Sequence, residues 1–291
     1  MCQRKWWGYY ISGGGRQARA VGNMKGKIAL ITGGAAGIGR AITERLAKRG
    51  AKIAILDIDA RKGEEFASEL NSKHGKDSAI YARCDVTDRK SFKECFDKTK
   101  SSLGNPNVLV NNAGIWDDSP SGWERQVNIN FKGPINGSLL ALEYMGKKNG
   151  GAGGAVLNTS SVLGLLASPI MPIYSGTKAG VLLFTRCFGT EFHYKLNGVR
   201  FVAICPHATG GSALFDNLDK CFSIPGPEMV DLYKSGVSDG DYQTIDAVAD
   251  AAVHVLEKGK NGSVWTVGQN KGPEEFQFKD AQLVLSGSTN I

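Results

Sequence analysis

Several features are missing from this 291-residue sequence. No apolar run approaches the roughly 18 residues that a membrane-spanning helix needs, so we expect no membrane span. None of the six cysteines forms a C-x-x-C pair, which argues against metal and disulfide sites and predicts small buried side chains in a reducing, cytoplasmic compartment. The 38 glycines follow no three-residue repeat, which excludes a collagen-like fold.

The net charge of +7 is concentrated at the N-terminus. Residues 1–23 hold Arg4, Lys5, Arg16 and Arg19 but no acid, whereas acids and bases are interspersed in the rest of the chain. Without a basic stripe in the folded part, we expect no nucleic-acid partner. The first 23 residues also lack a secretory apolar segment and any regular period. They are interpreted as a disordered extension or the product of an upstream start, before one domain at 24–291.

Short apolar runs alternate with longer helical stretches from Lys27 onward. Strands are predicted at 27–32, 52–57, 78–84, 108–111, 155–159, 199–205 and 263–267. Helices are predicted at 39–49, 60–74, 89–103, 123–148, 174–196 and 244–258. Strands separated by helices predict a single α/β domain with a doubly wound parallel sheet and helices on both faces.

A glycine-rich turn, Thr32–Gly39, follows the first predicted strand and precedes a helix. Gly33 permits a tight turn, Gly37 lets the backbone approach a diphosphate, and Gly39 lets the helix pack close to the strand. The helix N-terminus would direct free N–H groups and a positive dipole end at the phosphates. The segment therefore predicts a dinucleotide site.

Asp57 ends the second predicted strand, at the position where a carboxylate binds the adenosine ribose. It would accept hydrogen bonds from a 2′-hydroxyl and repel a 2′-phosphate, and Asp59 adds a second acid. Arg40 is the nearby cation that could offset this repulsion, and Arg61 lies further along. The pattern favours NAD over NADP.

Three further motifs occur in order: Cys84-Asp85-Val86, Asn111-Asn112-Ala113-Gly114 and Tyr174-Ser175-Gly176-Thr177-Lys178. Together with the glycine turn they resemble the short-chain dehydrogenase/reductase family, over roughly residues 24–270. The resemblance implies a Rossmann-like, seven-stranded sheet and a nicotinamide dinucleotide cofactor. Within the family, the segments at 142–151 and 158–161 are most similar to the NAD-dependent 15-hydroxyprostaglandin dehydrogenases. The Tyr174–Lys178 segment also resembles the insect alcohol dehydrogenases.

Tyr174 and Lys178 are four residues apart and so share one helix face. A free tyrosine, with a pKa of about 10, is a poor base at neutral pH. A lysine ammonium one turn away, together with the positive charge of an oxidised nicotinamide, lowers that pKa. The resemblance assigns Ser161 to orient the substrate oxygen and Asn130 to hold a water of a proton relay. Ser160 is the alternative, but the spacing to Tyr174 favours Ser161.

Further cofactor contacts follow from the resemblance. They are Gly33, Gly37, Ile38, Gly39, Asp57, Ile58, Asp85, Val86, Asn112, Tyr174, Lys178 and Thr209. The family usually has Pro-Gly after the sixth strand, whereas this chain has Pro206-His207. His207 could distort the nicotinamide end or add a titratable group there. The residue that binds the carboxamide group of the nicotinamide is then Thr209 or Ser212.

Met171 and its apolar neighbours precede Tyr174 and favour an apolar, lipid-like or terpenoid alcohol, or else simple core packing. The helix predicted at 174–196 is apolar on more than one side, which predicts a second buried face and a homodimer. We therefore expect an NAD-dependent oxidoreductase that interconverts a secondary alcohol and a ketone, with Ser161 and Met171 contacting substrate. The alternative is a non-catalytic NAD-binding, storage or regulatory member of the same fold.

Overall fold

The computed structural model describes residues 24–212, 214, 220–224, 226–236, 242–268 and 271–278. The extension predicted at 1–23 lies outside the described residues. None of the helices within the described ranges is both long enough and apolar enough to span a membrane.

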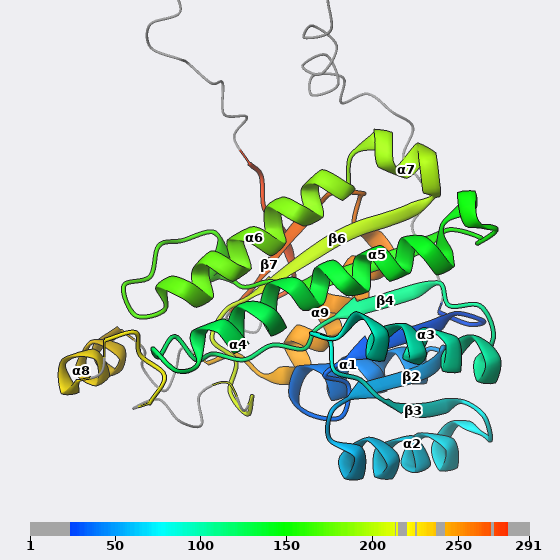
Figure 1. The fold of residues 1–291 in the computed structure, drawn as a ribbon, viewed down its shortest axis with the longest axis horizontal. Coiled ribbons are helices and arrows are strands. Elements are labelled where there is room, and N and C mark those ends of the chain that lie inside the picture. Colours follow the sequence, from blue (N-terminus) through cyan, green and yellow to red (C-terminus); the bar gives the residue numbers. More distant parts are fainter. Residues whose placement is uncertain are drawn as a thin grey trace, which may run out of the picture.

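In the described chain, eight strands form one sheet in the order β3-β2-β1-β4-β5-β6-β7-β8 (Figure 1). They are β1 (Ile28–Thr32), β2 (Lys52–Asp57), β3 (Ala79–Arg83), β4 (Val108–Asn111), β5 (Gly154–Thr159), β6 (Val199–Pro206), β7 (Val264–Val267) and β8 (Glu274–Glu275). The first seven are parallel, as predicted, and β8 is antiparallel to β7. The extra strand has only two residues, too few to produce an alternating pattern.

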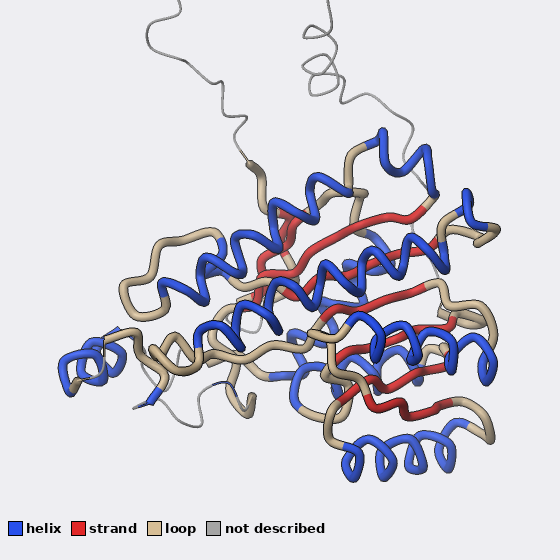
Figure 2. The backbone as a smooth tube through the Cα atoms, viewed as in Figure 1, coloured by secondary structure: helices blue, strands red, loops and turns tan. Residues whose placement is uncertain are grey.

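Helices cover both faces of the sheet (Figure 2). The described helices are α1 (Gly37–Lys48), α2 (Ala60–His74), α3 (Arg89–Leu103), α4 (Trp123–Val127), α5 (Gly133–Met145), α6 (Pro172–Phe188), α7 (Glu191–Asn197), α8 (Pro227–Gly236) and α9 (Ile245–Lys258). A π-helical turn (Asn128–Lys132) joins α4 to α5, and short 3₁₀ turns lie at Lys147–Asn149 and Val162–Gly164. Apolar side chains of α1, α2 and α9 pack on one face, and those of α3 and α5 on the other.

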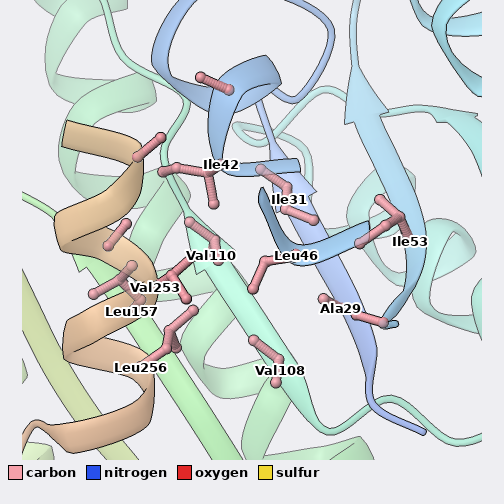
Figure 3. Packing of buried hydrophobic residues seen from close by; sticks show 14 of the residues in the cluster. Ala29, Ile31, Ile42, Leu46, Ile53, Val108, Val110, Leu157, Val253 and Leu256 are labelled. Carbon is pink, nitrogen blue, oxygen red and sulfur yellow. The ribbon is translucent and has the colours of Figure 1, made fainter. Parts of the chain in front are cut away.

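The strands are apolar at nearly every position because both of their faces are buried. Along β1, Ala29 and Ile31 point to the layer of α1 and α9, while Ile28 and Leu30 point to the layer of α3 and α5. Figure 3 shows the first of these layers, where Leu46 of α1 packs among the strands. This continuous core holds the carboxyl ends of the parallel strands along one edge, where a doubly wound sheet binds its ligands.

Two long helices predicted from the sequence are each interrupted. In the stretch predicted as one helix at 123–148, the π-helical turn separates α4 from α5, and α5 ends at Met145. The stretch predicted at 174–196 stops at Phe188, and α7 begins only at Glu191. A Cβ at Gly189 would lie 2.2 Å from the Cα of Gly262, so the two backbones approach closely at this break.

The cysteine prediction holds for four of the described residues. Cys84, Cys95, Cys205 and Cys221 are buried, but Cys187 on α6 is exposed. Apolar neighbours in the sequence do not decide which side of a helix a residue occupies, and Cys187 lies on the outer side.

Candidate active site

The glycine turn between β1 and α1 has the conformation that its sequence predicts. Gly33 and Gly37 have positive φ angles of 63° and 51°, which glycine adopts without strain. A Cβ at Gly39 would lie 2.0 Å from the carbonyl oxygen of Gly33, so only glycine lets α1 start this close to the strand. Among the described residues, no side chain caps the first turn of α1, and its N–H groups are available to an anion.

A cleft of about 590 Å³ opens beside this turn. Gly37 and Ala41 of α1 line one side of it, and Gly210, Gly211 and Gln243 line the other. The cleft therefore connects the glycine turn with the loop that follows β6. Arg40, Glu44 and Asp246 also line the cleft, so charged side chains of both signs border it.

Asp57 is fixed beside the glycine turn at the end of β2. One carboxylate oxygen accepts the N–H of Ala35 at 3.0 Å, and the other accepts the N–H of Asp59 at 3.1 Å. Each oxygen keeps acceptor capacity for a further donor. The carboxylate is thus held in place and can still accept a ribose hydroxyl.

The charged neighbours of Asp57 are already paired. The Arg40 guanidinium bonds to Glu69, lies 3.3 Å from Glu44 and stacks 3.8 Å from the ring centre of Phe66. Asp59 caps α2 by accepting the N–H of Lys62 at 3.0 Å, and its charge is met by the Lys62 ammonium. Arg40 and Asp59 are thus both engaged by partners on α1 and α2.

Residues expected near the adenine lie on the neighbouring strand ends. Ile58 follows β2 and is 59% exposed, which leaves an apolar surface open. Asp85 accepts the N–H and the hydroxyl of Thr87 at 2.9 and 2.7 Å, and these bonds hold its pKa below the usual range. Val86 is buried against Gly133.

Asn112 hydrogen-bonds Thr32 twice and ties the end of β4 to the glycine turn. Its backbone N–H donates to the Thr32 hydroxyl, and its side-chain amide donates to the Thr32 carbonyl.

The two serines after β5 make different contacts. The Ser160 hydroxyl donates to the backbone carbonyl of Lys178 at 2.9 Å, which ties β5 to α6. The Ser161 hydroxyl instead accepts the N–H of Leu163 at 3.2 Å, and it lies close enough to the Tyr174 phenol to lower the pKa of that group. The structure therefore places Ser161, and not Ser160, beside the phenol.

Tyr174 and Lys178 lie one turn apart on α6, with the lysine nitrogen 5.4 Å from the phenol ring centre. Burial raises the pKa of Tyr174, and the Ser161 hydroxyl partly opposes that rise. Burial also lowers the pKa of Lys178 to about 8, and its ammonium donates to the carbonyl of Thr159 at 3.0 Å. The chain alone therefore shifts the tyrosine away from the phenolate, opposite to the direction that the sequence analysis expects for the complete site.

Asn130 lies in the π-helical turn and is fully buried. Its side chain accepts the N–H of Ile115 at 2.9 Å and donates to the carbonyl of the same residue at 2.7 Å. A Cβ at Gly114 would lie 3.4 Å from the Asn130 oxygen and 3.5 Å from the Lys178 nitrogen. Asn130 and Lys178 thus border the same narrow space, and Gly114 keeps it open.

An apolar cluster surrounds the buried phenol. Met171 packs with Tyr174, Trp116 and Phe222, and Tyr233 of α8 closes the group. The indole of Trp116 lies 5.5 Å from the Phe222 ring and 6.2 Å from the Tyr233 ring, centre to centre. These side chains are buried and pack on one another around the phenol, as the core-packing alternative for Met171 predicts.

The loop after β6 is locked by local hydrogen bonds. The Thr209 hydroxyl donates to the carbonyl of His207 at 2.8 Å, and Ser212 donates to the carbonyl of Thr209 at 2.9 Å. The Gln243 side-chain amide donates to the carbonyl of Val267 at 3.0 Å and to the hydroxyl of Thr209 at 3.3 Å. The His207 side chain is exposed and its ring lies against Gly268, where a Cβ would come within 2.6 Å of it.

Sequence reasoning missed three buried polar residues near the site: Asp118, Gln126 and Gln243. None belongs to a motif. Asp118 and Gln243 contact segments distant in the chain, and Gln126 contacts the backbone of Asp117 and the carboxylate of Asp118. The one available signal was the pair Asp117-Asp118 shortly after the Asn111–Gly114 motif, because consecutive acids there follow a strand end.

A family model described as short chain dehydrogenase matches residues 27–220. The chain belongs to this family. It is an oxidoreductase with the family's Rossmann-like fold, and the family uses nicotinamide cofactors. The expectation drawn from the ordered motifs is confirmed.

Relatives support the same assignment. The chain is 36% identical to human 15-hydroxyprostaglandin dehydrogenase (NAD⁺) over 263 residues, which cover 89% of this chain and 96% of that protein. It is 26% identical to fat body protein 2 of Drosophila melanogaster over 84% of this chain and 93% of that protein. A crystal structure of a dehydrogenase/reductase from Sinorhizobium meliloti 1021 has a TM-score of 0.69 at 24% identity, covering 84% and 95%, and shows the shared fold.

Proposed function

We propose that the protein catalyses the NAD-dependent interconversion of a secondary alcohol and a ketone. The observation that carries this proposal is the placement of the Ser161 hydroxyl beside the buried Tyr174 phenol, with the Lys178 nitrogen 5.4 Å from the phenol ring centre. A hydroxyl beside a buried phenol suits proton transfer to or from a substrate oxygen. The name of the human relative records NAD⁺ as its cofactor.

Each member of the set has a chemical role in this proposal. Ser161 orients the alcohol oxygen, and Tyr174 accepts its proton. The Lys178 ammonium stabilises the phenolate form of Tyr174 that accepts this proton, and Asn130 holds a water that passes the proton onward. Bound NAD⁺ supplies the hydride acceptor, so the balanced products of oxidation are ketone, NADH and one proton.

NAD is the favoured cofactor because of the charges at the end of β2. Asp57 presents a fixed carboxylate, and the cation that could offset a 2′-phosphate, Arg40, is engaged by Glu44 and Glu69. A phosphate beside Asp57 would meet like charge without a partner. The apolar cluster of Trp116 and its neighbours supports an apolar alcohol as the substrate.

We further propose a homodimer formed through the outer sides of α5 and α6. Leu183 of α6 is 62% exposed, Phe192 of α7 is 52% exposed and Leu139 of α5 is 39% exposed. An interface between subunits would remove these large apolar side chains from water. A symmetric pair would cover both copies of the area at once.

The proposal is tested by NAD⁺ reduction with long-chain hydroxy-lipids, terpenoid alcohols and short secondary alcohols. Alkaline conditions favour oxidation because a proton is released. We expect turnover with apolar alcohols, and we expect Tyr174→Phe to lose turnover while it still binds NADH. Binding of NAD⁺ without turnover on any alcohol would instead favour a cofactor-binding regulatory protein. Turnover retained by Tyr174→Phe would remove that residue from the mechanism.

A further inference from the structure

A buried acid outside the recognised motifs contacts the helix that carries Tyr174. Asp118 lies in the loop between β4 and α4 and is 1% exposed. One of its oxygens accepts the N–H of Ile173 at 2.8 Å, and the other accepts the N–H of Tyr174 at 3.0 Å. A carboxylate that accepts backbone N–H bonds is stabilised in its ionised form.

These bonds complete the first turn of α6. A helix start leaves its first N–H groups without intrahelical partners. Here Pro172 has no N–H, and the cap residue Met171 makes no side-chain bond to the turn. The N–H of Ser175 bonds the carbonyl of Met171 at 2.9 Å. The two donors that remain, on Ile173 and Tyr174, are those that Asp118 accepts.

Asp118 is itself held from two sides. Gln126, fully buried on α4, donates its amide to the Asp118 carboxylate at 2.7 Å. The same amide accepts the N–H of Asp117 at 2.7 Å, which fixes its orientation. The N–H of Asp118 bonds the carbonyl of Cys221 at 2.8 Å, ahead of α8. The carboxylate therefore has little freedom to leave the helix end.

We propose that Asp118 is a positioning residue that holds Tyr174 in place at the start of α6. It anchors the backbone of the residue whose phenol transfers the proton. This inference rests on the proposed dehydrogenase function, and it assigns a role to a residue that the ordered motifs do not include. A shift of about 1 Å in a reacting group can cost about 100-fold in rate.

Charged and titratable groups around the Tyr174 phenol come from α6, β6, α8 and the loop that carries Asp118. Lys178 lies on its own helix, Cys205 faces it from β6, and Tyr233 packs against it from α8. Burial raises the pKa of Tyr174 most, and the charges of Asp118 and Cys205 raise it further. Asp118 thus makes the phenol harder to deprotonate while holding it in place, so the two effects can be separated by experiment.

The first test compares Asp118→Asn with Asp117→Asn, a matched change of charge in the same loop that does not touch α6. Loss of the negative charge should move the acidic midpoint of the kcat–pH profile to lower pH in Asp118→Asn only. Asp118→Ala should lower kcat by about 100-fold, with the KM for NAD⁺ within about twofold of the parent. An unshifted midpoint in Asp118→Asn, or an equal loss of kcat in Asp117→Asn, overturns the inference.

The second test needs no catalysis. Amide hydrogen exchange at Ile173 and Tyr174 should accelerate in Asp118→Asn, since one of the two N–H groups would face an amide donor, and stay unchanged in Asp117→Asn. Unchanged exchange in both variants overturns the inference whatever the activity. If the parent protein oxidises none of the alcohols, the proposed function fails, but this exchange measurement still decides whether Asp118 holds the turn.

Discussion

The buried ammonium of Lys178 lowers the stability of the fold at neutral pH. Burial lowers the pKa of Lys178 from 10.5 in the unfolded chain to about 8 in the fold. Below pH 8 both states bind the proton, so the folded state carries the full cost of the buried charge. Between pH 8 and 10.5 the folded state loses its proton first, so this contribution to stability rises with pH.

Lys178→Met should therefore abolish turnover but melt at a higher temperature than the parent at neutral pH. The gain should shrink as the pH rises through about 8, because the parent then loses its penalty. Thermal unfolding of both proteins across this range measures the difference. A variant that melts below the parent at neutral pH would mean that the bond to the Thr159 carbonyl outweighs the cost of burial.

Asp57 should determine cofactor choice by charge. We expect kcat/KM to favour NAD⁺ over NADP⁺ by at least ~100-fold, since each 1.4 kcal/mol of like-charge cost is about tenfold. Asp57→Ala should narrow this ratio, mainly by weakening NAD⁺ binding. Arg40→Ala is the control: its guanidinium is engaged by Glu44 and Glu69, so the ratio should stay close to that of the parent. Similar kcat/KM values for the two cofactors in the parent would contradict this role of Asp57.

At the scale of the elements, α6 contains two glycines with opposite surroundings. Gly176 is exposed, and a Cβ there would meet nothing within 4 Å. A Cβ at Gly180 would lie 2.9 Å from the Phe131 ring of the π-helical turn. Gly180 thus permits the close packing of α6 on the turn that carries Asn130, whereas Gly176 only reduces the helical propensity of α6.

Gly176→Ala should raise the free energy of unfolding by up to about 1 kcal/mol, the gain in helix propensity. Gly180→Ala should lower the free energy of unfolding and reduce kcat, because Phe131 and the adjacent Asn130 must move. Denaturant unfolding and steady-state kinetics of the pair measure both effects. Equal stability changes in the two variants would show that propensity alone governs α6.

At the scale of the whole molecule, the exposed apolar sides of α5 and α6 decide the proposed assembly. We expect a dimer in sedimentation of the parent and a monomer for Leu183→Lys, because a buried unpaired ammonium would oppose association. Leu232→Lys is the matched control: Leu232 of α8 is 42% exposed and lies outside this area. A monomeric parent, or dissociation by the α8 change, would refute the interface.

The amino-acid sequence by itself determined the order of strands and helices and the positions of the motifs. β2, β4, α2 and α3 have the predicted bounds because each combines a local period with clear ends, such as the caps Asp59 and Asp88. The glycine turn and the Tyr174–Lys178 pair were readable for the same reason, since their residues are neighbours in the chain. What depends on spacing along one element can be predicted from the sequence.

Only the tertiary structure decided what depends on distant partners. Gly189, where α6 ends, lies close to the backbone of Gly262, and the two-residue strand β8 pairs with β7. The choice of Ser161 over Ser160 was inferable by spacing, but the use of Ser160 as a tie to α6 was not. Asp118 bonds Ile173 across 55 residues of chain, so no local pattern marks it. Burial, which sets the acidity of Tyr174 and Lys178, exists only once the sheet, α6 and α8 enclose them.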